Sequence, residues 1–195
     1  MDRCELHDTL CRYRSRFPEE AAYAHRACRL LQESPRCFDR ETDGLHVTAS
    51  TWVLNLRRDA TLLMLHRKLG QWFQPGGHAD GDEDVMRVAL RECSEETGLP
   101  AERIRLLSPT IFDVDIHRIP ATRREPEHEH LDIRFLVEID ESLPLPGNDE
   151  SHELRWVALR DVPRYNRERS LHRLVVKSGA WRRSVERAYG RGRGG

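Results

Sequence analysis

The sequence predicts an α/β fold, or an α+β fold with a mixed sheet. Apolar residues recur at three- and four-residue spacing up to about residue 35, which is typical of helices. From residue 46 the spacing changes to two, which indicates strands, and one amphipathic helix interrupts them. The 195 residues suffice for one domain with a buried core and an appendage. We therefore divide the chain into an N-terminal helical extension (1–45), a main domain (46–189) and a disordered tail (190–195).

The composition is polar but compatible with a folded globular protein, since charged residues make up 33% and hydrophobic residues 38% of the chain. The net charge of −1 favours no particular partner. Residues 155–195 differ, because they hold twelve Arg or Lys residues against three Asp or Glu residues. We interpret this stretch as the solvated basic face of surface helices. Contact with a polyanion or a nucleic acid is the less favoured alternative.

The five cysteines are expected to be reduced thiols. Their number is odd and the sequence has no C-x-x-C pair, which argues against a disulfide framework and against a zinc site. No apolar run reaches transmembrane length, and residues 1–5 do not open a signal peptide. We therefore expect a soluble protein of the cytoplasm that has no membrane partner.

Residues 1–35 are expected to form helices. Leu6, Leu10 and Tyr13 recur at helical spacing. Pro18 suits the first turn of a second helix, where the glutamates that follow it interact favourably with the helix dipole. Packing on the main domain is the favoured role of these helices. Two alternatives stay open, namely covering a substrate and pairing two subunits in a homodimer.

The central element of the main domain is a helix expected over residues 84–97. Gly98 ends this helix, because glycine readily adopts the left-handed conformation found at helix C-termini. Runs in which polar and apolar residues alternate, or in which apolar residues follow one another, predict the strands. Stretches rich in proline and charged residues separate them. The other expected elements are strands over 46–56, 60–68, 103–115, 131–139 and 151–159, a loop over 69–77 and a helix over 170–188.

Three carboxylates share one face of the central helix. Glu92, Glu95 and Glu96 stand three and four residues apart, so they repel one another unless a cation lies between them. Glu92 and Glu96 flank the apolar arc that contains Ala89 and Cys93, where burial without a counter-ion would be costly. Ligands that are all oxygen favour Mg²⁺ or Mn²⁺ over zinc. Ordinary surface glutamates are the alternative if the helix is considered alone.

The residues around this helix match a longer pattern. Gly77 is followed after five residues by Glu83, and after seven more by the run R-E-C-S-E-E-T-G-L over 91–99. This spacing resembles the Nudix box, G-x5-E-x7-R-E-U-x-E-E-x-G-U, where U is a bulky aliphatic residue. The one departure is Cys93, a smaller hydrophobic residue that can still pack there. The resemblance to Nudix hydrolases covers about residues 46–160 and is closest to a bacterial, uncharacterised subgroup with a PGGHADGDED-type box.

The resemblance implies a Nudix fold, an α/β/α sandwich around a mixed sheet, here with an N-terminal helical extension. It also implies that water attacks one phosphorus of a diphosphate, while Mg²⁺ or Mn²⁺ neutralises the phosphoryl charge and lowers the pKa of a bound water. Glu83 and Arg91 are implied to form a structural ion pair. The implied metal ligands are the catalytic residues Glu92, Glu95 and Glu96, together with the carbonyl group of Gly76.

Residues outside the box are candidates for substrate binding. In a strand over 128–137, His128, His130, Asp132 and Arg134 would share one face, which suggests a cleft lining. A solvent-facing edge strand is the alternative. His130 suits proton transfer near neutral pH, and it could also contact phosphate or bind metal.

Several residues near the predicted loops have two interpretations each. His78 either hydrogen-bonds within its loop or contacts phosphate. Arg67 and Lys68 either meet substrate phosphates or are simply exposed. Trp72 and Phe73 either stack on a nucleobase or pack in the core, and core packing is favoured. The loop pair Arg123-Arg124 is interpreted as solvated, with closure over a substrate as the alternative.

Three functions are compatible with these features. The favoured one is a pyrophosphohydrolase acting on a nucleoside diphosphate linked to another moiety, such as a nucleotide sugar, an ADP-ribose-like compound or a dinucleotide. The second is a house-cleaning nucleoside triphosphate pyrophosphohydrolase. The third is a Nudix-fold binding or regulatory module. The complete set of glutamates argues against the third, because a binding module does not need three metal ligands.

Overall fold

The computed structural model describes residues 1–42, 44–67, 70–122, 126–148 and 151–191. The helices of this part are α1 (Arg3–Arg12), α2 (Pro18–Glu33), α3 (Val85–Thr97), α4 (Val162–Tyr165) and α5 (Arg169–Arg191), with short 3₁₀ turns at Ala101–Arg103 and Leu159–Asp161. The strands are β1 (Leu45–Leu54), β2 (Ala60–His66), β3 (Trp72–Phe73), β4 (Gly76–His78), β5 (Arg105–Leu106), β6 (Asp113–Ile119), β7 (His128–Glu138) and β8 (Ser151–Ala158).

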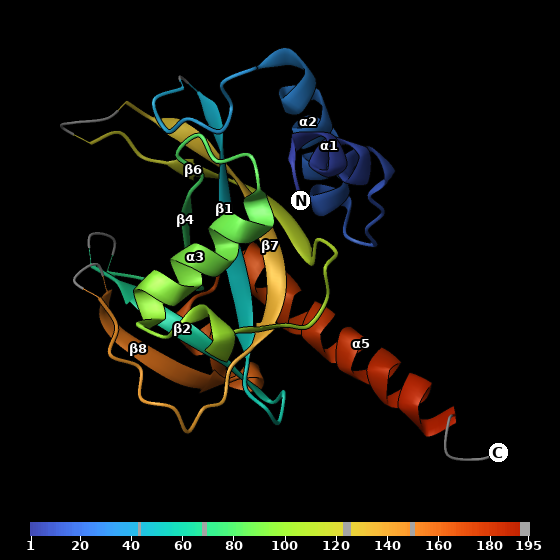
Figure 1. Ribbon diagram of the computed structural model, residues 1–195, viewed down its shortest axis with the longest axis vertical. Coiled ribbons are helices and arrows are strands. Elements are labelled where there is room, and N and C mark those ends of the chain that lie inside the picture. Colours follow the sequence, from blue (N-terminus) through green and yellow to red (C-terminus); the bar gives the residue numbers. More distant parts are fainter. Residues whose placement is uncertain (43, 68–69, 123–125, 149–150, 192–195) are drawn as a thin grey trace.

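The eight strands of the described residues form one mixed sheet with helices on both faces, which confirms the predicted fold class (Figure 1). The strand order is β3–β2–β1–β7–β5, and β4 pairs with β1, β6 with β7 and β8 with β2. Strands β1 and β7 run parallel along ten residue pairs at the centre, and the other pairings are antiparallel.

Alternation along β1 separates the two layers of the core. Val47 and Ala49 share an apolar cluster with Val88 of α3, whereas Trp52 shares another with Leu174 of α5. Helix α3 therefore covers one face of the sheet and α5 the other (Figure 1). Both faces of β1 are covered, which explains why all ten of its residues are buried.

Several predicted boundaries differ from the structure. The strand predicted over 103–115 is instead the short β5 and the separate β6, and the loop predicted over 69–77 contains β3 and the start of β4. Helix α5 continues to Arg191, two residues into the predicted tail, and residues 192–195 lie outside the described part. No helix within the described residues is long and apolar enough to span a membrane.

The two N-terminal helices pack on the sheet beside β6, as predicted. Leu6 and Leu10 of α1 are buried in the same apolar cluster as Val114 of β6. Arg26 of α2 forms an ion pair with Glu129 of β7. The burial of Leu6 and Leu10 supports the packing role of the two helices. The alternatives, covering a substrate and pairing two subunits, stay untested.

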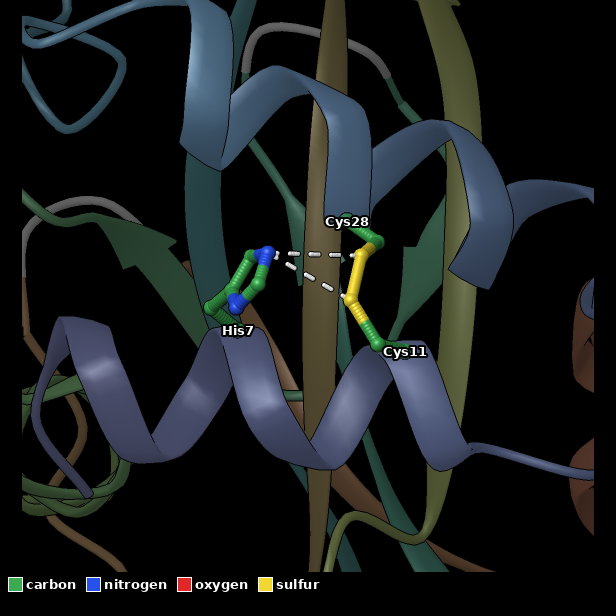
Figure 2. Close-up of side chains that lie close together, drawn as sticks. All are labelled: His7, Cys11 and Cys28. Carbon is green, nitrogen blue, oxygen red and sulfur yellow. Dashed lines mark hydrogen bonds between the residues drawn. A yellow bond between two sulfur atoms is a disulfide. The ribbon is translucent and has the colours of Figure 1, made fainter.

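The expectation of five reduced thiols is wrong for two residues. Cys11 of α1 and Cys28 of α2 form a disulfide, and His7 lies beside it (Figure 2). Cys4 is an exposed free thiol, and Cys37 and Cys93 are buried free thiols. The sequence did not reveal this pair because the two cysteines are 17 residues apart and meet only when α1 packs on α2.

Reduction of the disulfide is expected to destabilise the protein. Closing a loop of this length removes about 3 kcal/mol of chain entropy from the unfolded state, which corresponds to roughly 6–12 °C in Tm for a chain of this size. We expect dithiothreitol to lower the Tm of the wild type by that amount in a thermal melt. The double variant Cys11→Ser/Cys28→Ser should melt at the lower temperature with or without reductant. An equal Tm for the oxidised and reduced wild type would contradict the disulfide.

Candidate active site

The helix at the centre of the predicted site forms as expected, whereas the predicted loop before it contains a short strand. Gly76 and Gly77 lie in β4 and pair with Ser50 and Ala49 of β1. Helix α3 begins after Asp84, whose side chain accepts a hydrogen bond from the backbone NH of Arg87 at 3.1 Å. It ends at Gly98, whose φ of +72° is the left-handed conformation that glycine tolerates best. Two of the glutamates of this helix, Glu92 and Glu96, lie against the glycines of β4.

Glu92 and Glu96 approach β4 closely, whereas Glu95 does not. Oε2 of Glu96 accepts a hydrogen bond from the NH of Gly76 at 2.8 Å, and the Glu96 residue is only 4% exposed. A Cβ atom at Gly77 would overlap the carboxylate of Glu92. Glu95 is exposed and lines a shallow surface groove beside Leu90. The structure thus brings together Gly76, Gly77 and two of the three predicted glutamates.

The predicted ion pair between Glu83 and Arg91 does not form in this structure. Glu83 pairs instead with Arg3, at 3.1 Å between Oε1 and Nη1, because α1 brings Arg3 to the start of the acidic loop. Nη2 of Arg91 lies 2.8 Å from Oε1 of Glu92 and donates to the carbonyl oxygen of His78 at 3.0 Å. Arg91 therefore still braces β4 on the helix, but it does so through the backbone of β4.

The predicted histidines lie together on the other face of β4. His78 follows Gly77 directly, so its side chain points away from α3. Its ring lies 4.8 Å from that of His130 and 5.3 Å from that of His46, measured between centroids. Burial and the neighbouring histidines lower the pKa of His130 to about 2, so its imidazole is neutral at physiological pH. We call the group His46, His78, His117, His128 and His130 the histidine cluster.

Sequence reasoning missed two members of this cluster. His46 faces His130 in the parallel pairing of β1 with β7, and His117 faces it from β6. His46 is the first residue of the period-two pattern and shares the face of Thr48 and Ser50, which is the only signal that the sequence offered. Neither residue is near the box in the chain, so their meeting depends on strand register.

The polar face predicted on β7 is confirmed, but it is not an edge strand. Asp132 and Arg134 are 3% and 2% exposed, and Nε of Arg134 lies 2.7 Å from Oδ2 of Asp132. Strand β7 lies between β1 and β6, so no solvent reaches these two residues. They belong to a buried ion-pair network with Asp113 and Arg173. This stretch therefore anchors the sheet to α5 instead of lining a cleft.

Comparison with known proteins agrees with the motif and the fold. The model of the NUDIX domain matches residues 44–177. The chain belongs to this family.

Curated relatives of the Nudix domain match over part of the chain. One is a probable DHNTP pyrophosphohydrolase of Lactococcus lactis, 30% identical over 98 residues, with 50% of this chain and 56% of the relative covered. Another is a putative 8-oxo-dGTP diphosphatase of Mycobacterium tuberculosis, 36% identical over 114 residues, with 54% of this chain and 49% of the relative covered. The chain spans about half the length of these relatives.

Solved Nudix structures share the fold. A Caenorhabditis elegans Ap4A hydrolase superposes with a TM-score of 0.59 at 18% identity, covering 71% of this chain and 98% of that structure. A MutT NUDIX hydrolase of Burkholderia pseudomallei superposes with a TM-score of 0.53 at 24% identity, covering 69% of this chain and 98% of that structure. At these identities the likeness establishes the fold alone.

The donors at the Nudix site suit a hard divalent ion. The carboxylates of Glu92 and Glu96 and the backbone of Gly76 offer only oxygen, the donor type that Mg²⁺ prefers. Because Gly77 has no Cβ atom, the carboxylate of Glu92 can approach its backbone closely. The three glutamates do not form one compact group in this structure, because Glu95 stays at the surface.

The two glycines are expected to respond differently to substitution. In Gly77→Ala the new methyl group meets the end of a flexible glutamate side chain, which can move away. We expect an unchanged Tm and a kcat lower by roughly 10²-fold, because Glu92 is displaced from the site. In Gly76→Ala the methyl group meets the backbone of Ser50 and Ala49, so we expect loss of stability. A Tm loss confined to Gly77→Ala would contradict this assignment.

The other predicted residues pack in the core, are exposed or lie outside the described residues. Trp72 and Phe73 pack against the core cluster of α5, and Trp72 contacts Tyr165 edge to face at 5.4 Å. This agrees with the favoured core role. Arg67 is exposed at the end of β2. Lys68, Arg123 and Arg124 lie outside the described residues.

Proposed function

We propose that the protein is a Nudix pyrophosphohydrolase that cleaves the diphosphate of a nucleoside diphosphate linked to another moiety. The observation that supports this best is the pair of carboxylates, Glu92 and Glu96, held against the glycines of β4. A binding module would have no use for these two acids in so confined a place, where unneutralised carboxylates are costly. We therefore favour an enzyme over a binding or regulatory module.

In this proposal Glu92, Glu95, Glu96 and the Gly76 carbonyl group hold Mg²⁺ or Mn²⁺. The ion supplies charge neutralisation at the phosphoryl oxygens and a bound water of lowered pKa. The NH of Gly76 holds Glu96 in place, and Arg91 holds Glu92. Since the transition state is stabilised mainly by charge and position, these fixed carboxylates account for most of the expected rate gain.

Substrate contacts are proposed outside the box. Arg67 is exposed and cationic, so we propose it as a phosphate contact. The role of His78, His128 and His130 in substrate binding stays a prediction. Their rings gather on the face of the sheet opposite to Glu92, which argues against it. The cytoplasmic location and the homodimer also stay predictions.

A second candidate function is hydrolysis of a nucleoside triphosphate to a monophosphate and pyrophosphate. The names of the two curated relatives favour it, since each name specifies a triphosphate as the substrate. The two functions share the reacting atoms and differ only in the groups on either side of the diphosphate.

A substrate panel with product analysis separates the two functions. The protein would be incubated with MgCl₂ or MnCl₂ and ADP-ribose, nucleotide sugars, dinucleoside polyphosphates and nucleoside triphosphates. Formation of a nucleoside monophosphate and a phosphorylated partner supports the first function, and release of pyrophosphate supports the second. If the wild type cleaves no member of the panel faster than Glu96→Gln does, the protein is not a hydrolase of this type.

A further inference from the structure

The histidine cluster contains a compact group of possible metal ligands. One ring nitrogen each of His46, His78 and His130 lies within 4.8 Å of the other two. The ring centroids of His46 and His130 are 4.8 Å apart. These residues come from β1, β4 and β7. Both β4 and β7 pair with β1, so the backbone fixes the spacing of the three histidines. A tetrahedral zinc site needs nitrogens roughly 3.4 Å apart, since Zn–N bonds are about 2.1 Å. Small side-chain movements would close the remaining gap.

His128 lies beside this group, with its Nε2 close to His130. Its Nδ1 lies 2.9 Å from the carbonyl oxygen of Pro126, an acceptor, so Nδ1 carries the proton and Nε2 keeps its lone pair. Nε2 of His128 lies 3.2 Å from Nε2 of His130, which is close to the edge length of a tetrahedral site. A histidine that donates one NH to a carbonyl group and presents the other nitrogen is the usual arrangement at a protein metal site.

The chemistry of the cluster selects the class of metal. A neutral imidazole ring binds a metal ion through the lone pair of one ring nitrogen. Imidazole ligands suit zinc, copper, nickel and iron, whereas Mg²⁺ prefers oxygen. His7, Cys11 and Cys28 form the other compact group within the described residues. That group lacks thiolates, because the two sulfur atoms are bonded to each other (Figure 2).

We propose that His46, His78 and His130 bind one transition-metal ion of the Zn²⁺ class, with Nε2 of His128 as the fourth ligand. This site is distinct from the carboxylate site of α3, since the imidazoles lie on the opposite face of the sheet. A metal there ties β4, and with it Gly76 and Gly77, to β1 and β7.

Cobalt titration tests the proposal. Tag-free protein, stripped with EDTA, would be titrated with CoCl₂ and then with ZnCl₂. We expect one equivalent of Co²⁺ with the visible ligand-field bands of four-coordinate nitrogen ligation, displaced by Zn²⁺. His78→Ala and His130→Asn should weaken Zn²⁺ binding by about 100-fold or more, since loss of an outer-shell partner alone costs 10- to 100-fold. His128→Ala should weaken it by about tenfold.

Matched controls separate this site from the others. His172→Asn, at an exposed position of α5, and Glu96→Gln in the Nudix site should show the same four-coordinate cobalt bands as the wild type, and unfolding of the metal-free variants checks that they are folded. Absence of the bands, equal bands in His78→Ala and the wild type, or loss of the bands in Glu96→Gln would overturn the proposal. Thiolate charge-transfer bands would overturn it too, because they would place the ion at Cys11 and Cys28.

Discussion

Glu96→Gln is expected to lower kcat by on the order of 10²–10³-fold with the best substrate of the panel. The variant keeps the size of the side chain and its hydrogen bond, since an amide oxygen accepts from the NH of Gly76 as a carboxylate does. It loses the negative charge that the proposed metal requires. We expect the Tm to be unchanged or higher, because Glu96 is almost completely buried.

A surface glutamate provides the matched control for this experiment. Glu102 is exposed on the short turn after α3, and Glu102→Gln changes the same charge outside the site. Its kcat should equal that of the wild type. Steady-state assays across a Mg²⁺ titration would measure both variants. Wild-type turnover by Glu96→Gln would refute the metal role of Glu96, whatever the substrate.

Arg173→Met is expected to cost about 3–5 kcal/mol of unfolding free energy. Arg173 is 2% exposed, and its Nε lies 2.8 Å from Oδ2 of Asp113 while Nη2 lies 3.0 Å from Oδ1 of Asp115. These aspartates are buried between β6 and α5. Burial raises the pKa of Asp113, whereas the hydrogen bonds of Arg173 favour the charged forms of both carboxyl groups. Without the guanidinium group they remain in the core with too few positive partners. Urea denaturation with fluorescence detection would measure the loss.

Arg182→Met is the control on the same helix, because Arg182 is exposed and forms its ion pair with Glu186 in the next turn. It should change stability by less than about 0.5 kcal/mol. A double variant, Arg173→Met/Asp113→Asn, should recover part of the loss, since it removes one of the charges left unpaired. A loss below 1 kcal/mol in Arg173→Met would mean that the buried network does not stabilise the sheet against α5.

The buried network also changes the interpretation of the basic C-terminal stretch. The sequence favours a solvated face, yet Arg173 and Lys177 turn inwards and pair with Asp113 and with Glu20 of α2. Part of the positive charge of this stretch therefore neutralises acidic residues of β6 and α2. A charge count along the chain cannot reveal this, because the acids lie more than fifty residues upstream.

The sequence alone determined the central helix, its ends and its glutamates. The Asp84 cap, the Gly98 stop and the three- and four-residue spacing are local signals, each set by residues within one or two turns. The motif also singled out Gly77, whose backbone lies close to the Glu92 carboxylate. The mixed sheet followed from the alternation of strands and helices.

Only the tertiary structure decided which distant side chains meet. Glu83 pairs with Arg3 and not with Arg91, and Cys11 is bonded to Cys28. His46 lies beside His78 and His130. Each outcome depends on strand register or on helix packing, which the whole core fixes by excluding alternatives. Local propensity holds no information about such pairs. The residues of the proposed hydrolase site therefore lie in one continuous motif, whereas the residues of the proposed histidine site come together only because three strands align.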